Sequence, residues 1–190
     1  MNIILGSASK WRQQILKDAG FVFEIIHADI DEQKIRHDDP KQLVIDIANA
    51  KAEAILLKTK TPAILITVDQ VVACNSEIFE KPTSASQVQY FCEQYNNHNP
   101  QTITGIVVIN TTTGKKAEGV DVTTVYFNHI PPQEINRIIK EGEIFHCAGG
   151  FQIEGANGKI NPYIDHFDGS TDSVKGLPMK LLKKLIAEVK

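Results

Sequence analysis

The order of apolar and polar positions along the chain predicts alternating strands and helices. Short apolar or alternating runs predict strands over residues 3–6, 21–27, 63–73, 102–110 and 120–128. Apolar positions at helical spacing predict helices over residues 9–19, 40–58, 84–95, 131–141 and 176–189. Strands and helices mixed in this order indicate an α/β protein with a long, twisted sheet.

Small and polar residues mark the expected ends of the first two helices. Ser9 has the side chain of a helix N-cap, and Gly20 is suited to end the helix that follows. Pro40 is favourable in the first turn of a helix and predicts the start of the long second helix. Residues 27–40, HADIDEQKIRHDDP, predict a polar loop rich in acidic side chains.

The length, charge and cysteine content of the chain limit the classes of protein that it fits. A chain of 190 residues with 42% hydrophobic residues predicts one domain, or two closely joined lobes, with a sizeable core. The net charge of −3 argues against a nucleic-acid groove or a surface for acidic membranes. The sequence shows neither an apolar run of membrane-spanning length nor a signal-peptide pattern. Cys74, Cys92 and Cys147 are widely spaced among apolar residues, which favours a reducing cytoplasm over disulfides or a zinc site.

The segment LGSASKWRQQIL joins the first expected strand to the first helix through small residues. Backbone N–H groups at such a helix start, together with hydroxyl groups, bind anions such as phosphate. The segment lacks the spacing of a Walker loop and of a dinucleotide-binding loop, and an ordinary capped helix after a strand is the alternative interpretation. Trp11 is the only tryptophan of the chain and stands between Lys10 and Arg12.

Asp69 is an informative polar residue because it lies inside an apolar strand. An unpaired polar group in such a strand costs about 2–7 kcal/mol, so the carboxylate must meet a cation, a hydrogen-bond donor or a cleft. At the end of a strand this carboxylate is suited to act as a general base or a metal ligand. An aspartate that caps a turn at the strand end is the alternative.

Two lysines raise the same question on other elements. Lys51 has apolar neighbours on the second expected helix, and its ammonium must reach a partner. Lys81 precedes a proline, which holds it in an extended conformation. Together with Ser7 and Arg12, the two lysines would form a clamp for a triphosphate. Lysines whose stems cover apolar surface while their charge stays in water are the alternative.

Acidic residues of the polar loop add metal-binding chemistry. Asp29, Asp31 and Glu32 offer hard oxygen atoms of the kind that magnesium or manganese prefers. A solvated acidic loop is the alternative interpretation.

Short motifs in a fixed order give the chain a resemblance to one family. They are GSASKWR, DIDE, ANAKAEA, VDQVV, EKP, TG, HCAGGFQIEG and GLP, and they extend over nearly the whole chain. In their order and spacing they resemble the Maf family of nucleoside triphosphate pyrophosphatases. The resemblance implies an elongated mixed sheet flanked by helices, similar to inosine triphosphate pyrophosphatases. It also implies a single domain over residues 1–190 with two lobes and a cleft between them.

The same resemblance implies a reaction and the residues that serve it. Members cleave nucleoside triphosphates between the α- and β-phosphates, giving a nucleoside monophosphate and pyrophosphate. They use a divalent cation (Mg, Mn or Co), are cytoplasmic and form homodimers, and no nucleic-acid or membrane partner is expected. The matching positions imply phosphate binding by Ser7, Arg12, Lys51 and Lys81, proton acceptance by Asp69, and metal binding by Glu32 and Asp69.

One residue and one segment depart from the pattern of the family. Lys10 stands where many members have proline, so the loop before the first helix is less stiff. The segment GSTDSVKGLP differs from the common SYTNVVGLP, so contacts from this segment are not carried over.

Trp11, Gln70 and Glu154 occupy positions that differ between substrate branches of this family. Members that cleave dTTP and UTP carry arginine, threonine and glutamine there, and the trio in this chain resembles the branch that cleaves 7-methyl-GTP. Methylation at N7 makes guanine cationic, and a tryptophan face attracts a cation by about 0.5–2 kcal/mol. A carboxylate such as Glu154 accepts two hydrogen bonds from guanine. The expected function is hydrolysis of 7-methyl-GTP to 7-methyl-GMP and pyrophosphate, which prevents incorporation of modified nucleotides.

Two other functions stay open at this point. One is a dTTP/UTP pyrophosphatase of the same family, and the other is a non-catalytic nucleotide-binding regulator of cell division. Pyrophosphate release separates the regulator from the enzymes, and a panel of nucleotides separates the two enzymes.

Overall fold

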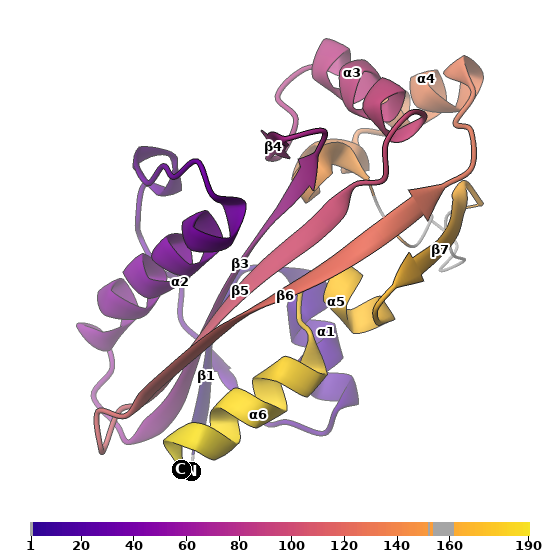
Figure 1. Cartoon of the computed structure of the whole chain (residues 1–190). Helices are drawn as coiled ribbons and strands as arrows, with labels where there is room; N and C mark the ends of the chain where they lie inside the picture. Colours follow the sequence, from indigo (N-terminus) through magenta and orange to yellow (C-terminus); the bar gives the residue numbers. More distant parts are fainter. Residues whose placement is uncertain (1, 152, 154–161) are drawn as a thin grey trace. The chain divides into compact units, whose positions relative to one another are not determined.

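The computed structural model describes residues 2–151, 153 and 162–190, which form a seven-stranded mixed sheet with flanking helices (Figure 1). The strands are β1 (Asn2–Gly6), β2 (Glu24–Ile25), β3 (Ala63–Cys74), β4 (Glu77–Phe79), β5 (Gln101–Asn110), β6 (Lys116–Phe127) and β7 (Ile164–Asp168). The α-helices are α1 (Lys10–Asp18), α2 (Pro40–Leu56), α3 (Ala85–Tyr95), α4 (Pro132–Glu141), α5 (Thr171–Val174) and α6 (Met179–Val189). Short 3-10 turns are η1 (Glu32–Lys34), η2 (Glu143–His146) and η3 (Ala148–Gly150). The predicted α/β class with a mixed sheet is confirmed.

The order of the strands brings the end of β1 next to the middle of β3. The sheet runs β2-β1-β3-β5-β6-β7, and β4 pairs with β3 outside this path. β1 is parallel to β2 and β3, whereas the pairs β3–β4 and β6–β7 are antiparallel. Gly6, the last residue of β1, pairs with Thr67. The loop after β1 therefore begins beside the segment of β3 that contains Asp69.

The chain divides into two compact units. The first unit comprises Met1–Gln70, Thr104–Asp121 and Lys175–Lys190, and the second comprises Val71–Ile103 and Val122–Val174. The boundaries fall inside β3, β5 and β6, so each of these long strands contributes to both units. The expected cleft between two lobes stays a prediction.

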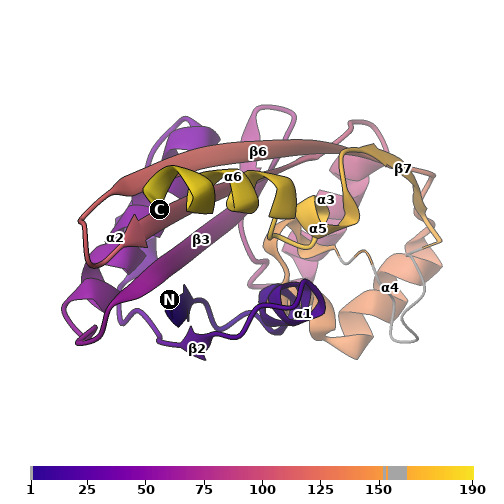
Figure 2. The ribbon, with the colours of Figure 1, turned by 90° about the horizontal axis from the view of Figure 1, so that it is seen from below.

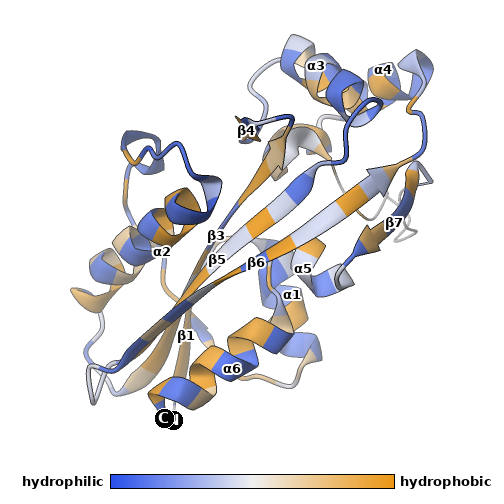
Figure 3. Ribbon diagram, viewed as in Figure 1, coloured by the Kyte–Doolittle hydropathy of each residue, from blue (hydrophilic) through white to orange (hydrophobic). Residues whose placement is uncertain are grey.

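The core of the first unit has two apolar layers, one on each face of its strands. Successive residues of a strand point to opposite faces, so each strand contributes to both layers. The layer on the α2 side includes Ile4, Ala48, Ile55, Leu65 and Val107. The layer on the side of α1 and α6 includes Leu5, Leu16, Ile66, Leu182 and Leu185. Figure 3 shows the hydrophobic residues of α6 in alternation with hydrophilic ones, as such a one-sided helix requires.

A glycine of β6 lets α6 lie directly on the sheet (Figure 2). A Cβ atom on Gly119 would lie 2.9 Å from Cδ1 of Leu181, so a larger residue there would require the Leu181 side chain to shift. This close contact packs α6 on β6 within the first unit.

The core of the second unit is rich in aromatic side chains. Phe79 and Phe91 stack with ring centroids 4.1 Å apart, and Tyr95 stacks on Phe127 at 5.2 Å. The hydroxyl group of Tyr95 donates a hydrogen bond to the carbonyl oxygen of Gly149 at 2.5 Å. These contacts tie the short turn η3 to α3.

Most expected elements are confirmed, with differences at their ends. The strand expected over 21–27 is wrong in length, because only Glu24 and Ile25 belong to β2. β6 begins at Lys116, earlier than the expected 120–128, and α6 begins at Met179 after a proline. The sequence pattern does not predict β4, β7 or α5, because these are short and mostly exposed or irregular in burial. Among the described residues, the helices are too short or too polar to cross a membrane.

Candidate functional site

The loop between β1 and α1 is held close to α2 by a glycine. A Cβ atom on Gly6 would lie 2.5 Å from Cδ1 of Ile55 and 2.7 Å from Cγ2 of Thr67, so glycine is required for this approach. Ser9 is the N-cap of α1, and its Oγ accepts a hydrogen bond from the backbone N–H of Arg12 at 3.4 Å. The N-cap prediction is confirmed.

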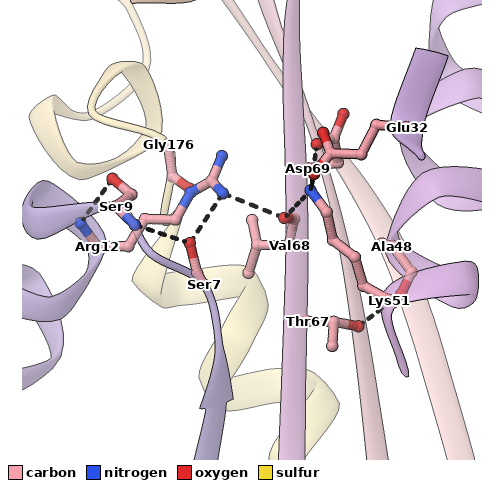
Figure 4. A network of polar contacts seen from close by, with 10 residues as sticks. All are labelled: Ser7, Ser9, Arg12, Glu32, Ala48, Lys51, Thr67, Val68, Asp69 and Gly176. Atoms are coloured by element: carbon pink, nitrogen blue, oxygen red, sulfur yellow. Dashed lines mark hydrogen bonds and ion pairs between the residues drawn. The ribbon is translucent and has the colours of Figure 1, made fainter. Parts of the chain in front are cut away.

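The Arg12 guanidinium is fixed by neutral oxygen atoms from separate segments of the first unit (Figure 4). Its Nε donates to the carbonyl oxygen of Gly176 at 2.9 Å. Its Nη1 donates to Oγ of Ser7 at 3.2 Å and to the carbonyl oxygen of Val68 at 3.1 Å. Burial lowers the pKa of Arg12, and nearby carboxylates oppose that effect. Ser7, Arg12 and Gly176 are called the arginine group below.

Lys51 and Asp69 form a buried ion pair between α2 and β3. Nζ of Lys51 lies 2.7 Å from Oδ1 of Asp69, and each side chain keeps only 10% of its surface exposed. The same Nζ donates to the carbonyl oxygen of Val68 at 3.5 Å. Removal from water raises the pKa of Asp69, although the charges of Lys51 and Arg12 oppose the rise. The carboxylate in the apolar strand therefore meets a cation, and the turn-capping alternative is wrong.

Glu32, in η1, adds a second carboxylate to this pair. Its Oε1 lies 3.1 Å from Nζ of Lys51, and its side chain is half exposed at 51%. Asp29 and Asp31 pair instead with other lysines, at 2.6 and 3.4 Å. Glu32, Lys51 and Asp69 are called the acidic group below. One ammonium between two carboxylates leaves this group with a net negative charge.

The acidic group offers donor atoms of the type that a hard divalent cation requires. The carboxylates of Glu32 and Asp69 converge on one cation, the ammonium of Lys51. The described part of the chain contains no cluster of three or more His, Cys, Asp or Glu side chains suited to a metal. Magnesium is commonly held by one or two carboxylates together with substrate phosphates. The donor set fits that arrangement rather than a closed protein site.

β3 separates the arginine group from the acidic group (Figure 4). Thr67 and Asp69 both point to the α2 side, where Oγ1 of Thr67 donates to the carbonyl oxygen of Ala48 at 2.7 Å. The carbonyl oxygen of Val68 accepts from the cations on both sides, Arg12 and Lys51. The predicted phosphate residues Ser7 and Arg12 thus meet each other, whereas Lys51 meets carboxylates.

The residues expected to read the base are described only in part. Trp11 is 44% exposed, and Nζ of Lys175 lies 5.8 Å from the centroid of its ring. Nε2 of Gln70 donates to Oγ1 of the buried Thr104 at 2.9 Å. Glu154 lies outside the described residues. Trp11 is therefore partly accessible, and a cation lies over its ring.

Lys81 belongs to the second unit and is described with that unit alone. It is exposed and lies between β4 and the buried Pro82. Its expected place beside the phosphate residues of the first unit stays a prediction.

Two residues of the site are not singled out by the sequence pattern. Gly176 receives the hydrogen bond from Nε of Arg12, and Thr104 receives one from Gln70. The motif GLP is the sequence signal for Gly176, and the sequence TG at Thr104 matches another motif of the family resemblance. Sequence spacing says nothing of either contact, because the partners are far apart along the chain.

The sequence is similar to those of two named pyrophosphatases over nearly its whole length. A 7-methyl-GTP pyrophosphatase from Dictyostelium discoideum is 38% identical over 194 residues, which cover 98% of this chain and 96% of that protein. A dTTP/UTP pyrophosphatase from Desulforamulus reducens is 32% identical over 180 residues, which cover 95% of this chain and 92% of that protein.

A solved structure and a family match complete the comparison. The Staphylococcus aureus Ham1 protein aligns with a TM-score of 0.52 over the full length of both chains, at 12% sequence identity. At that identity the likeness concerns the fold alone. Residues 2–189 match the family described as Maf-like protein. Because this match extends over nearly the whole chain, the chain belongs to the Maf family.

Proposed function

We propose that the chain is a nucleoside triphosphate pyrophosphatase, a hydrolase that releases pyrophosphate. The observation that carries the proposal is the buried Asp69 of the acidic group, 2.7 Å from Lys51, in a member of the Maf family. Both named relatives are pyrophosphatases by name, and they differ in the nucleotide. A carboxylate whose pKa is raised by burial is a stronger base than an exposed one.

Asp69 is the proposed general base. It takes a proton from the water that attacks the α-phosphorus, and the bond from that phosphorus to the bridging oxygen breaks. Oδ1 of Asp69 accepts from Lys51, whereas Oδ2 accepts no hydrogen bond within the described chain. No side-chain oxygen or nitrogen that is sealed from solvent lacks a partner among the described residues. Oδ2 is therefore not sealed from solvent, as the proposed step requires.

The arginine group is the proposed site for phosphate oxygens. Its internal acceptors are a hydroxyl group and two carbonyl oxygens, so within the described chain no hydrogen-bonded carboxylate neutralises the Arg12 guanidinium. The N-terminus of α1 adds the positive end of the helix dipole. Arg12 would stabilise the negative charge that builds up on the leaving pyrophosphate. Lys51 and Lys81 are proposed as further phosphate-binding residues.

A divalent cation (Mg, Mn or Co) is the proposed cofactor, held by Glu32 and Asp69. The convergence of their carboxylates on the ammonium of Lys51 supports this assignment. When bound, such an ion supplies charge neutralisation of the triphosphate.

7-Methyl-GTP is the proposed nucleotide. The name of the relative from D. discoideum supports this choice, and so does Trp11, which is 44% exposed. A tryptophan ring attracts a cationic base, which would have to take the place of the Lys175 ammonium over the ring. Gln70 and Glu154 are proposed as the other residues that read the base. Cleavage of dTTP and UTP is the second candidate, supported by the name of the relative from D. reducens.

The proposed role in the cell is removal of a modified nucleotide before it enters RNA. A cytoplasmic location and a homodimer are further proposals from the family resemblance. Size-exclusion chromatography with light scattering tests the dimer directly.

Release of pyrophosphate from four nucleotides tests the proposed function. The purified chain with Mg is offered 7-methyl-GTP, GTP, UTP and dTTP, and kcat/KM is measured for each by a coupled pyrophosphate assay. The highest value for 7-methyl-GTP is expected. A highest value for UTP or dTTP supports the second candidate instead. Binding of a nucleotide without pyrophosphate release from any of the four would identify a regulator and contradict the enzyme.

A further inference from the structure

Gly176 sits in the loop before α6 with a backbone that favours glycine. Its φ angle is +91°, in the left-handed region, and the residue is buried. Its carbonyl oxygen accepts the hydrogen bond from Nε of Arg12 at 2.9 Å, across 164 positions of the sequence. The orientation of this carbonyl and the orientation of the Arg12 side chain are therefore linked.

A side chain at position 176 would crowd two polar side chains of the site. A Cβ atom there would lie 2.9 Å from Oε1 of Gln70 and 3.3 Å from Nε of Arg12. These atoms are polar ends of the side chains proposed for the base and for the phosphates. A larger residue at this position would push on both of them at once.

The contacts of Arg12 determine which part of its guanidinium remains for a ligand. A guanidinium has five N–H donors in a rigid plane. Nε uses one on Gly176, and Nη1 uses two on Ser7 and Val68. Nη2 makes no hydrogen bond within the described chain, and no sealed atom there lacks a partner, so Nη2 is not sealed from solvent. Three internal bonds fix the plane, and its two remaining donors point outward together.

We propose that Gly176 is a positioning residue for the phosphate-binding step, acting through Arg12. Its carbonyl oxygen anchors Nε, and its lack of a side chain leaves Arg12 and Gln70 their places. Nη2 of Arg12 is then aimed at two phosphate oxygens of the substrate. The inference rests on the proposed function, and it concerns a residue that neither the phosphate motif nor the base-reading trio includes.

Gly176→Ala, compared with Gly20→Ala, tests the inference with a matched control. Gly20 has a similar φ of +79°, belongs to the same unit and ends the helix that carries Arg12, but a Cβ there would meet nothing within 4 Å. Both variants carry a similar backbone strain, so Gly20→Ala reports the loss of stability that this strain alone causes. Gly176→Ala should lose kcat/KM for pyrophosphate release on the order of 100-fold, as a misplaced binding group does. Gly20→Ala should keep the kinetics of the wild type. Equal kinetics in the two variants would overturn the inference.

A double-mutant cycle separates positioning from a general structural role. If Gly176 acts mainly through Arg12, Gly176→Ala should lower kcat/KM far less in an Arg12→Ala background than in the wild type, with only the part that comes from Gln70 remaining. A full additional loss in that background would contradict the proposal.

Arg12→Lys provides a second test that does not depend on the folding of a Gly176 variant. Lysine keeps the positive charge but has no Nε–H to bind the carbonyl oxygen of Gly176 and no fork to present. A loss of kcat/KM close to that of Arg12→Ala is expected. Wild-type kinetics in Arg12→Lys would show that pyrophosphate release does not need the guanidinium plane of Arg12 anchored by Gly176.

Calorimetric titration with inorganic pyrophosphate distinguishes this inference from the proposed function. Gly176→Ala and Arg12→Ala should both weaken pyrophosphate binding relative to Gly20→Ala. If both variants bind pyrophosphate more weakly, as expected, but the wild type cleaves no nucleotide, the proposed function is wrong and the positioning role stands. If the wild type cleaves nucleotides but Gly176→Ala binds pyrophosphate normally, the positioning role is wrong and the proposed function stands.

Discussion

The two faces of β3 hold their cations in opposite ways. On the α2 face, Lys51 lies between the carboxylates of Asp69 and Glu32. On the other face, Arg12 is held by a hydroxyl group and two carbonyl oxygens. One carbonyl oxygen, that of Val68, accepts from both cations.

The partners determine the net charge that each face presents. Carboxylates cancel the charge of Lys51 and leave the acidic group negative, which suits a metal cation. Neutral oxygens orient Arg12 without cancelling its charge, so the arginine group stays positive and suits an anion. The proposed substrate, a triphosphate with its metal, would use both kinds of surface. β3 contributes the side chain of Asp69 to the acidic group and the carbonyl oxygen of Val68 to both cations.

Removal of the base should give the largest effect. Asp69→Asn keeps the shape of the side chain but cannot accept the proton, so turnover should fall by about 10²- to 10⁴-fold. Arg12 and its partners are untouched, so pyrophosphate binding by calorimetry should persist. The measurement is pyrophosphate release at saturating nucleotide, with circular dichroism to confirm the fold. Turnover equal to that of the wild type would remove Asp69 from the mechanism.

Replacement of Lys51, the cation of the acidic group, should shift the pH dependence of kcat/KM. Asp69 must be ionised to act, so kcat/KM should fall as the pH falls through its pKa. Burial raises that pKa above its ordinary value of 3.8, so the acidic limb of the wild type should lie above pH 3.8. Lys51 opposes the rise, so the limb of Lys51→Met should lie at still higher pH. Turnover should also fall, by about 10- to 100-fold.

Lys41→Met is the matched control for this shift, because Lys41 is an exposed lysine on the same helix. Its pH profile should equal that of the wild type. An acidic limb that stays in place in Lys51→Met would mean that the pKa of Asp69 does not control it.

A change on the helix of the arginine group should alter selectivity rather than turnover as a whole. Trp11→Ala removes the ring face, so the preference for 7-methyl-GTP over GTP should fall by about 2- to 30-fold in kcat/KM. Trp11→Phe keeps a ring face and should retain part of the preference. The ratio of the two kcat/KM values is the measurement, and an unchanged ratio in Trp11→Ala would mean that the ring does not read the base.

Loss of one neutral partner of Arg12 should give the smallest effect. Ser7→Ala removes one of three internal hydrogen bonds of the guanidinium, which is worth about 1 kcal/mol or about fivefold in kcat/KM. Ser9→Ala removes the N-cap of α1 and should lower the thermal midpoint instead. Kinetics and thermal unfolding of both variants test the distinction. If Ser7→Ala lost more kcat/KM than Lys51→Met, the arginine group would matter more for the reaction than the acidic group.

The sequence by itself determined the elements whose signals are local. The apolar spacing of α2, the N-cap at Ser9 and the buried run of β3 all depend on neighbours within a few positions, and the structure confirms them. The same reasoning showed that Asp69 needs a partner, because an unpaired carboxylate in an apolar strand is too costly. The length of β2 was overestimated because the weak alternation over 21–27 is a local signal. The strand itself is set by its pairing with β1, which extends over only two residues.

The tertiary structure alone decided which groups meet. Nothing in the spacing of the chain says that Lys51 reaches Asp69 and Glu32 rather than an open phosphate site, or that Gly176 anchors Arg12. These contacts follow from the order of the strands, which brings the end of β1 beside Thr67 and the loop before α6 beside Arg12. A sequence pattern records whether a side chain is buried, because burial repeats with the period of the element. It does not record the partner, because the partner is set by packing between segments that are distant in the sequence.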